Sequence, residues 1–129
     1  MKPLSILVAD DVDEIRDLIQ GCLSKAGHSV TCVGTGDEAL KLLKKQPFDL
    51  IIADVIMPDG DGLSVIMGIK KANMPVRILA ISGGGKYFPA ENCIHIAEGL
   101  GAHAALFKPF VPQTLFGAIE RAMGQSSAA

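Results

Sequence analysis

Hydrophobic and polar residues form two kinds of block that alternate along the chain. Short runs that are almost entirely apolar alternate with longer segments in which apolar residues recur every three or four positions. The short runs predict strands buried on both faces, and the longer segments predict amphipathic helices. The predicted strands are residues 5–9, 30–33, 50–54, 77–81 and 104–107, and the predicted helices are residues 12–26, 37–45, 63–72, 89–100 and 112–123.

Glycine and proline residues support these boundaries. Gly27 follows the first helical segment as a C-terminal cap, whereas Pro47 and Pro75 block the continuation of the second and third segments. Pro112 suits the first turn of the last helix, where its missing N–H group is not needed. Five strand-then-helix units follow one another, which predicts an α/β domain with a five-stranded parallel sheet between two layers of helices.

Reactive side chains follow four of the five predicted strands. Asp10 and Asp11 follow the first strand, Asp54 ends the third, Ser82 follows the fourth and Lys108 follows the fifth. Right-handed crossovers bring the carboxyl ends of parallel strands to one edge of the sheet. Because ligands bind at this edge in open α/β sheets, the sequence predicts a functional site there.

The side chains at this edge suit phosphoryl transfer. Neighbouring carboxylates repel one another unless a cation lies between them, and a set of hard oxygen ligands favours Mg²⁺. A carboxylate such as Asp54 can also attack phosphorus and form an aspartyl phosphate. Lys108 and Ser82 would neutralise and hydrogen-bond the phosphoryl group, and the backbone N–H of Gly83, which carries no side chain, can approach it closely.

Composition limits the class of protein. A chain of 129 residues with 49% hydrophobic residues predicts one globular domain, at residues 1–124, with a frayed tail at 125–129. A net charge of −2 without a basic run argues against nucleic acid as a partner of this chain. No apolar stretch approaches the ~20 residues of a membrane span, and we see no signal peptide. Three cysteines without a CxxC pair favour a reducing cytoplasm.

Simpler explanations compete for several of these residues. The paired acids after the first strand would serve on their own as a helix cap. Asp59 and Asp61 resemble the start of a calcium loop, but Lys70 stands where the closing glutamate would be. Residues 83–86 resemble part of a phosphate-binding loop but lack its leading glycine and its Ser/Thr. The three histidines have no ligand spacing and are better explained as packing or surface residues.

The motifs together resemble those of one family along essentially the whole chain. They are the paired acids 10–11, Asp54 followed by Met57-Pro58 and Gly60/Gly62, Ser82, and Lys108-Pro109-Phe110. Each motif is weak alone, but their order and their positions at strand ends are specific. The chain resembles the receiver domains of two-component response regulators.

This resemblance implies a flavodoxin-like (βα)5 fold with strand order 2-1-3-4-5, the known order of chemotaxis receivers. It implies that Asp54 is the phosphoacceptor and that Lys108 and Ser82 contact the phosphoryl group. The Lys108–Pro109 peptide bond would be cis, as X-Pro bonds readily allow.

The resemblance also implies a Mg²⁺ site. Asp11, Asp54 and the backbone carbonyl of Ile56 would bind the ion directly, and Asp10 would act through water. Ile56 has an apolar side chain and Gly84 has none, so neither can orient the water molecule that would attack the phosphoryl group. We therefore expect slow hydrolysis of the phosphoryl group.

The sequence departs from the family pattern in two places. Ala105 stands where the family has an aromatic residue whose ring swings inward when the Ser/Thr moves toward the phosphate. Residues 83–88 begin with three glycines, and the stretch after the fourth strand is longer than usual. We hypothesise that this loop takes over signalling through Tyr87 or Phe88. The alternative is that both rings cover an edge of the core.

By resemblance the chain is a phosphoacceptor rather than an enzyme. The donor would be a sensor histidine kinase or a histidine phosphotransfer protein, and we expect a monomer or weak dimer. We expect no DNA-binding segment in this chain, so the output would be contact with a downstream protein. Two alternatives stay open: a pseudo-receiver that binds partners without phosphate, and an aspartate-nucleophile phosphatase, although Ile56 replaces the general acid of such enzymes. Whether the chain is one domain of a longer protein is open as well.

Overall fold

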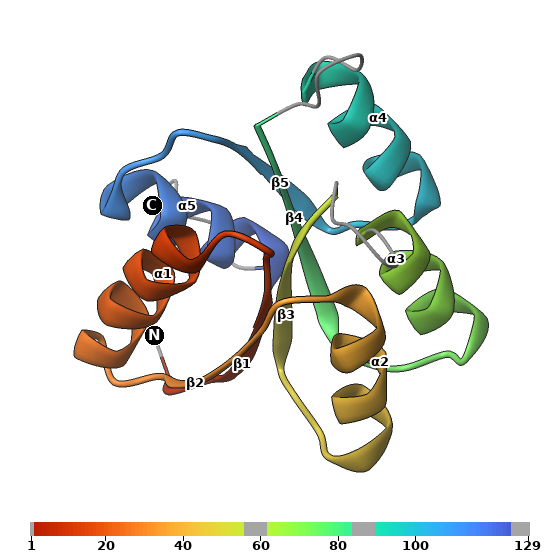
Figure 1. The fold of residues 1–129 in the computed structure, drawn as a ribbon, viewed down its shortest axis with the longest axis horizontal. Coiled ribbons are helices and arrows are strands. Elements are labelled where there is room, and N and C mark those ends of the chain that lie inside the picture. Colours follow the sequence, from red (N-terminus) through yellow and green to blue (C-terminus); the bar gives the residue numbers. More distant parts are fainter. Residues whose placement is uncertain (1, 56–61, 84–89, 125–129) are drawn as a thin grey trace.

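The computed structural model describes residues 2–55, 62–83 and 90–124, with the backbone alone at 90–94. Within these residues, five strands form one parallel sheet in the order β2-β1-β3-β4-β5 and alternate with five helices (Figure 1). The strands are β1 (Ser5–Ala9), β2 (Ser29–Val33), β3 (Leu50–Asp54), β4 (Arg77–Ser82) and β5 (Ala104–Phe107). The helices are α1 (Asp13–Lys25), α2 (Gly36–Lys45), α3 (Gly62–Lys71), α4 (Ala90–Leu100) and α5 (Pro112–Ala122). The predicted class and strand order are confirmed.

Helices cover both faces of the sheet (Figure 1). Helices α1 and α5 lie on one face, and α2, α3 and α4 lie on the other. Successive strand residues point to opposite faces, so Ile6 and Val8 pack toward α1 and α5, whereas Leu7 and Ala9 pack toward the other layer. Every residue of β3 is buried, as its continuous apolar run predicted.

The ends of the elements agree with the sequence-based prediction to within one residue. Gly27 has a φ of 94° and follows Ala26, the C-cap of α1, which confirms its position at the end of that helix. Pro112 is the first residue of α5. No helix in the part of the chain that the structure describes is long and apolar enough to cross a membrane.

Candidate functional site

Parallel pairing aligns the strand ends that carry the predicted functional residues. Ala9 pairs with Ala53, and Ser82 pairs with Phe107, so the residues that follow these pairs emerge at one edge of the sheet. The predicted groups brought to this edge are Asp10, Asp11, Asp54, Ser82, Gly83 and Lys108.

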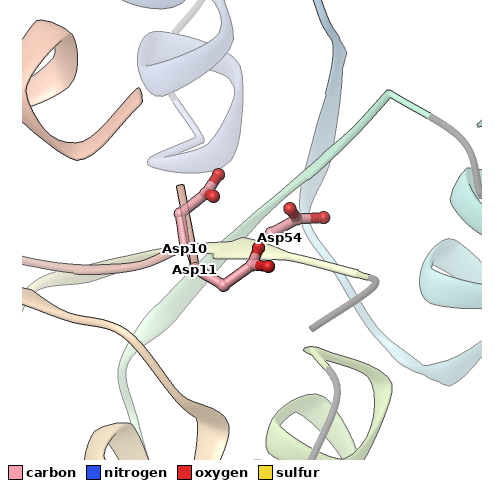
Figure 2. A group of neighbouring side chains, drawn as sticks. All are labelled: Asp10, Asp11 and Asp54. Carbon is pink, nitrogen blue, oxygen red and sulfur yellow. The ribbon is translucent and has the colours of Figure 1, made fainter. Parts of the chain in front are cut away.

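Three carboxylates gather at this edge (Figure 2). Asp10 and Asp11 follow β1, Asp54 ends β3, and one carboxylate oxygen from each lies within 4.8 Å of the other two. The three acids differ in depth: the Asp10 side chain is fully buried, the Asp54 side chain is 7% exposed, and Asp11 faces solvent. Asp11 therefore forms the open side of an otherwise buried acidic pocket.

Lys108 lies between the two deeper acids. Its Nζ donates a hydrogen bond to Asp54 Oδ2 at 2.9 Å and forms an ion pair with Asp10 Oδ2 at 2.8 Å. Burial alone would lower the pKa of Lys108, but its contacts with the two carboxylates outweigh burial and raise this pKa. The ammonium group is therefore charged at neutral pH.

The charges in the pocket fit a divalent cation. Three carboxylates against one ammonium leave two negative charges without compensation among these four side chains. Asp10 Oδ2 is buried, and the partner that the described structure gives it is Lys108 Nζ at 2.8 Å. Because every candidate ligand is a carboxylate oxygen, the donor set is of the kind that Mg²⁺ prefers, and Asp10, Asp11 and Asp54 could hold a metal ion.

The ends of β4 and β5 complete the pocket wall. The backbone N–H of Lys108 donates to the carbonyl of Ser82 at 2.9 Å, and Ser82 is fully buried. A Cβ at Gly83 would lie 3.3 Å from Lys108 Cβ, so the absence of a side chain lets this strand end pass close to the lysine stem. The Lys108–Pro109 peptide bond is cis, as the family resemblance implied.

Gly62 has a role that the sequence did not reveal. A Cβ at this position would overlap the carbonyl oxygen of Asp54 and lie 2.8 Å from the Cα of Val55. Only glycine therefore lets α3 begin against the end of β3. The sequence signalled a turn at this residue but not its contact with the backbone of Asp54.

Ala105 lines a surface hollow of about 540 Å³ beside α4, β5 and α5. Phe107 lines the same hollow and is 47% exposed. The methyl group of Ala105 leaves this space open, which agrees with its small size relative to the aromatic residue of the family pattern.

Several predictions fall on residues that the structure does not describe. They concern the carbonyl of Ile56, the calcium-like residues 59–61, the loop 84–88 with its switch hypothesis, and the tail 125–129. These interpretations stay predictions, as does the slow hydrolysis inferred from Ile56 and Gly84.

Two histidines have structural roles, as expected. His28 Nδ1 accepts a hydrogen bond from the backbone N–H of Leu4 at 3.0 Å, and His103 Nδ1 accepts one from Ile78 at 3.0 Å. Burial lowers the pKa of both histidines. His95 is exposed.

Comparison with known proteins identifies the family. The model of the response regulator receiver domain matches residues 6–120, and the chain belongs to this family. Among curated relatives, the DNA-binding transcriptional regulator NtrC of Azospirillum brasilense is 35% identical over 127 residues, which are 98% of this chain and 26% of that protein. The transcriptional regulatory protein GltR of Pseudomonas aeruginosa is 37% identical over 120 residues, which are 90% of this chain and 47% of that protein. The chain thus spans between about a quarter and about half of these relatives.

Solved structures agree with this assignment. The receiver domain of NtrX from Brucella abortus has a TM-score of 0.83 and 32% identity, with 94% of this chain and 99% of that chain covered. The chemotaxis protein CheY4 of Vibrio cholerae has a TM-score of 0.82 and 28% identity, with the same coverage. The fold is therefore that of a receiver domain over nearly the whole chain.

Family and site together define the class of this domain. A receiver domain is a signalling phosphoacceptor rather than a true enzyme. The acidic pocket of Asp10, Asp11 and Asp54 beside Lys108 is typical of a phosphoaccepting response regulator. Membership of the family implies Mg²⁺ as the metal and a histidine kinase as a partner.

Proposed function

We propose that Asp54 accepts a phosphoryl group and that the phosphorylated domain signals by contact with another protein. The observation that carries this proposal is the position of Lys108, whose Nζ lies 2.9 Å from Asp54 Oδ2 in a pocket with two further acids. A fixed ammonium beside the acceptor offsets the negative charge that phosphorylation brings, without any reorganisation of solvent.

The reaction needs few chemical groups beyond those of the pocket. A carboxylate oxygen of Asp54 forms a bond to phosphorus while the P–N bond of a donor phosphohistidine breaks. The imidazole leaves with the electron pair and takes up a proton. Lys108 would pair with the phosphoryl oxygens, and the Ser82 hydroxyl and the Gly83 N–H would donate hydrogen bonds to them.

The proposed metal ligands are Asp11, Asp54 and the backbone carbonyl of Ile56, with Asp10 acting through water. When bound, Mg²⁺ supplies positive charge for the phosphoryl oxygens. The depth of the acids supports these roles, because the exposed Asp11 can be reached from solvent, whereas the buried Asp10 already pairs with Lys108. Ile56 is proposed from the family pattern alone.

The proposed partners follow from the donor chemistry. The donor is a sensor histidine kinase or a histidine phosphotransfer protein, as the family implies. We place the protein in the cytoplasm on the same ground. We propose that it is a monomer or weak dimer and that its receiver domain spans residues 1–124.

Intact-protein mass spectrometry tests the proposal. The protein is mixed with acetyl phosphate and Mg²⁺, in parallel with Asp54→Asn and with Asp17→Asn, a matched change at an exposed acid of α1. We expect one phosphoryl-sized addition in the wild type and in Asp17→Asn, none in Asp54→Asn, and none with EDTA.

Labelling of Asp54→Asn to the same extent as the wild type would contradict the assignment of the acceptor. If neither acetyl phosphate nor a phosphorylated histidine phosphotransfer protein labels the wild type, the pseudo-receiver alternative replaces the proposal. Continuous release of phosphate from a phosphomonoester would instead indicate the phosphatase.

A further inference from the structure

Arg16 on α1 contacts the segment that carries the paired acids at two points. Its Nη1 donates a hydrogen bond to the backbone carbonyl of Asp10 at 2.5 Å, and its Nη2 forms a salt bridge with the carboxylate of Asp13. A Cβ at Gly34, just beyond β2, would lie 3.4 Å from Nη1. One side chain therefore lies against the end of β1, the first turn of α1 and the end of β2.

The other polar groups of Asp10 are held by different partners. Its N–H donates to the carbonyl of Val33 at 3.2 Å, its Oδ1 accepts from the N–H of Val12 at 2.9 Å, and its Oδ2 pairs with Lys108. Arg16 is the partner of its carbonyl group. Asp11 follows Asp10 directly and lies on the solvent side of the pocket. It therefore stands between Asp10 and Asp13, the two residues that Arg16 contacts.

We propose that Arg16 is a positioning residue of the acidic pocket. By holding the carbonyl of Asp10 and the carboxylate of Asp13, it fixes residues 10–13 in the arrangement that keeps a carboxylate oxygen of Asp10 and one of Asp11 within 4.8 Å of Asp54. The consequence is tighter binding of a divalent cation. The statement about the cation rests on the proposed function, whereas the statement about the order of the segment does not.

A positioning role and simple electrostatics predict opposite changes in cation affinity when Arg16 is replaced. Arg16 is positively charged, so removing its charge would by Coulomb's law strengthen the attraction of the pocket for a cation. If Arg16 instead orders the ligands, removing it weakens cation binding, because outer-shell partners that orient metal ligands support affinity about 10–100-fold. The direction of the change therefore separates the two effects.

The test uses Arg16→Met and Arg16→Lys, with Arg77→Met as the matched control. Arg77 also donates to a backbone carbonyl, that of Ala122 at 2.7 Å, but it begins β4 and so lies at the opposite end of the sheet. Calorimetry measures the dissociation constant for Mg²⁺, and NMR measures backbone ¹⁵N order parameters of Asp11 and Val12 in metal-free protein.

We expect Arg16→Met to weaken Mg²⁺ binding roughly tenfold, at the lower end of the outer-shell range, and to lower both order parameters. Arg16→Lys should also weaken binding, because one ammonium group cannot hold the carbonyl and the carboxylate in the same geometry. Arg77→Met should leave both measurements unchanged.

Unchanged or tighter Mg²⁺ binding in Arg16→Met would overturn the inference, and so would an equal loss in Arg77→Met. If Arg16→Met does not fold, Arg16→Lys decides by the same two readouts. If the wild type itself binds no Mg²⁺, the metal part of the proposed function fails. The positioning role of Arg16 is then tested by the order parameters alone, and values in Arg16→Met equal to those of the wild type overturn it.

Discussion

Replacement of Lys108 by methionine tests the electrostatic description of the pocket. Methionine keeps much of the length and apolar volume of the lysine stem but removes the charge. In the wild type the Lys108 side chain is 16% exposed and its Nζ lies within 2.9 Å of two carboxylates, one fully buried and one 7% exposed. The variant leaves these two acids facing each other without the ammonium group.

The expected loss of stability follows from this burial. Removing one partner of a buried ion pair costs about 3–5 kcal/mol, because the remaining charge is left without compensation. The open side of the pocket at Asp11 admits water and salt, so we expect about 3 kcal/mol in metal-free protein. For a chain of this size that corresponds to a fall of roughly 10 °C in the melting temperature. Saturating Mg²⁺ should restore part of the loss.

Urea unfolding in EDTA at neutral pH provides the assay. The raised pKa of Lys108 means that its contribution is fully present at this pH and is lost only as the pH rises above about 10.4, through the folded-state value. The control is Lys41→Met, at an exposed position on α2, which should change the free energy of unfolding by less than ~0.5 kcal/mol.

A double-mutant cycle with Asp54→Asn measures the interaction energy between Lys108 and Asp54. We expect Lys108→Met to cost at least ~1 kcal/mol less in the Asp54→Asn background, because one of the two acids is then already neutral. A Lys108→Met variant as stable as Lys41→Met in EDTA, or a coupling energy of zero, would contradict the electrostatic role of Lys108.

Two further predictions concern backbone contacts. Gly62→Ala should destabilise the protein by about 1–3 kcal/mol in thermal melts, because its Cβ would meet backbone atoms of Asp54. The control is Gly21→Ala, on α1, where an added Cβ would have nothing within 4 Å and the change should be neutral or stabilising. Equal losses of stability in the two variants would contradict the clash at Gly62. His28 is buried and its Nδ1 is an acceptor, so its lowered pKa stabilises the fold above about pH 6.5, and this contribution is lost as the pH falls toward the folded-state value. His28→Asn, which keeps an acceptor but does not titrate, should reduce the fall in stability as the pH drops below about 6.5, and an unaltered pH profile would contradict this role.

The arrangement of strands and helices could be predicted from the sequence because each element is short and its pattern is unbroken. The apolar run 50–54, bounded by Pro47 and the Asp-Gly-rich loop, has the length and turn signals of a buried strand. The extent of burial on the helices could not be predicted. Val12, the N-cap of α1, and Leu18 within α1 follow the predicted apolar spacing but are 38% and 41% exposed. Spacing marks the apolar side of a helix but not how much of that side the sheet can cover.

The gathering of the acids could also be predicted, because parallel topology forces strand ends to one edge. The two contacts of Lys108 could not, since a four-carbon stem reaches in many directions and only the packed structure selects one. The spacing of Asp13 and Arg16 is compatible with an i,i+3 ion pair, but the carbonyl of Asp10 as the second partner of Arg16 leaves no trace in the sequence. For the same reason Gly62 indicated a turn but not the backbone of Asp54 beside it.

We expect the edge formed by the carboxyl ends of β1, β3, β4 and β5 to receive the phosphoryl group. Backbone amide NMR shifts on addition of Mg²⁺ and then of beryllofluoride, a surrogate of the phosphoryl group on a carboxylate, locate the residues that respond. We predict the largest changes at residues 10–12, 54–55, 82–83 and 107–108, and none at residues 44–46 at the end of α2. Unchanged spectra, or changes centred away from Asp54, would contradict a phosphoryl site at this edge.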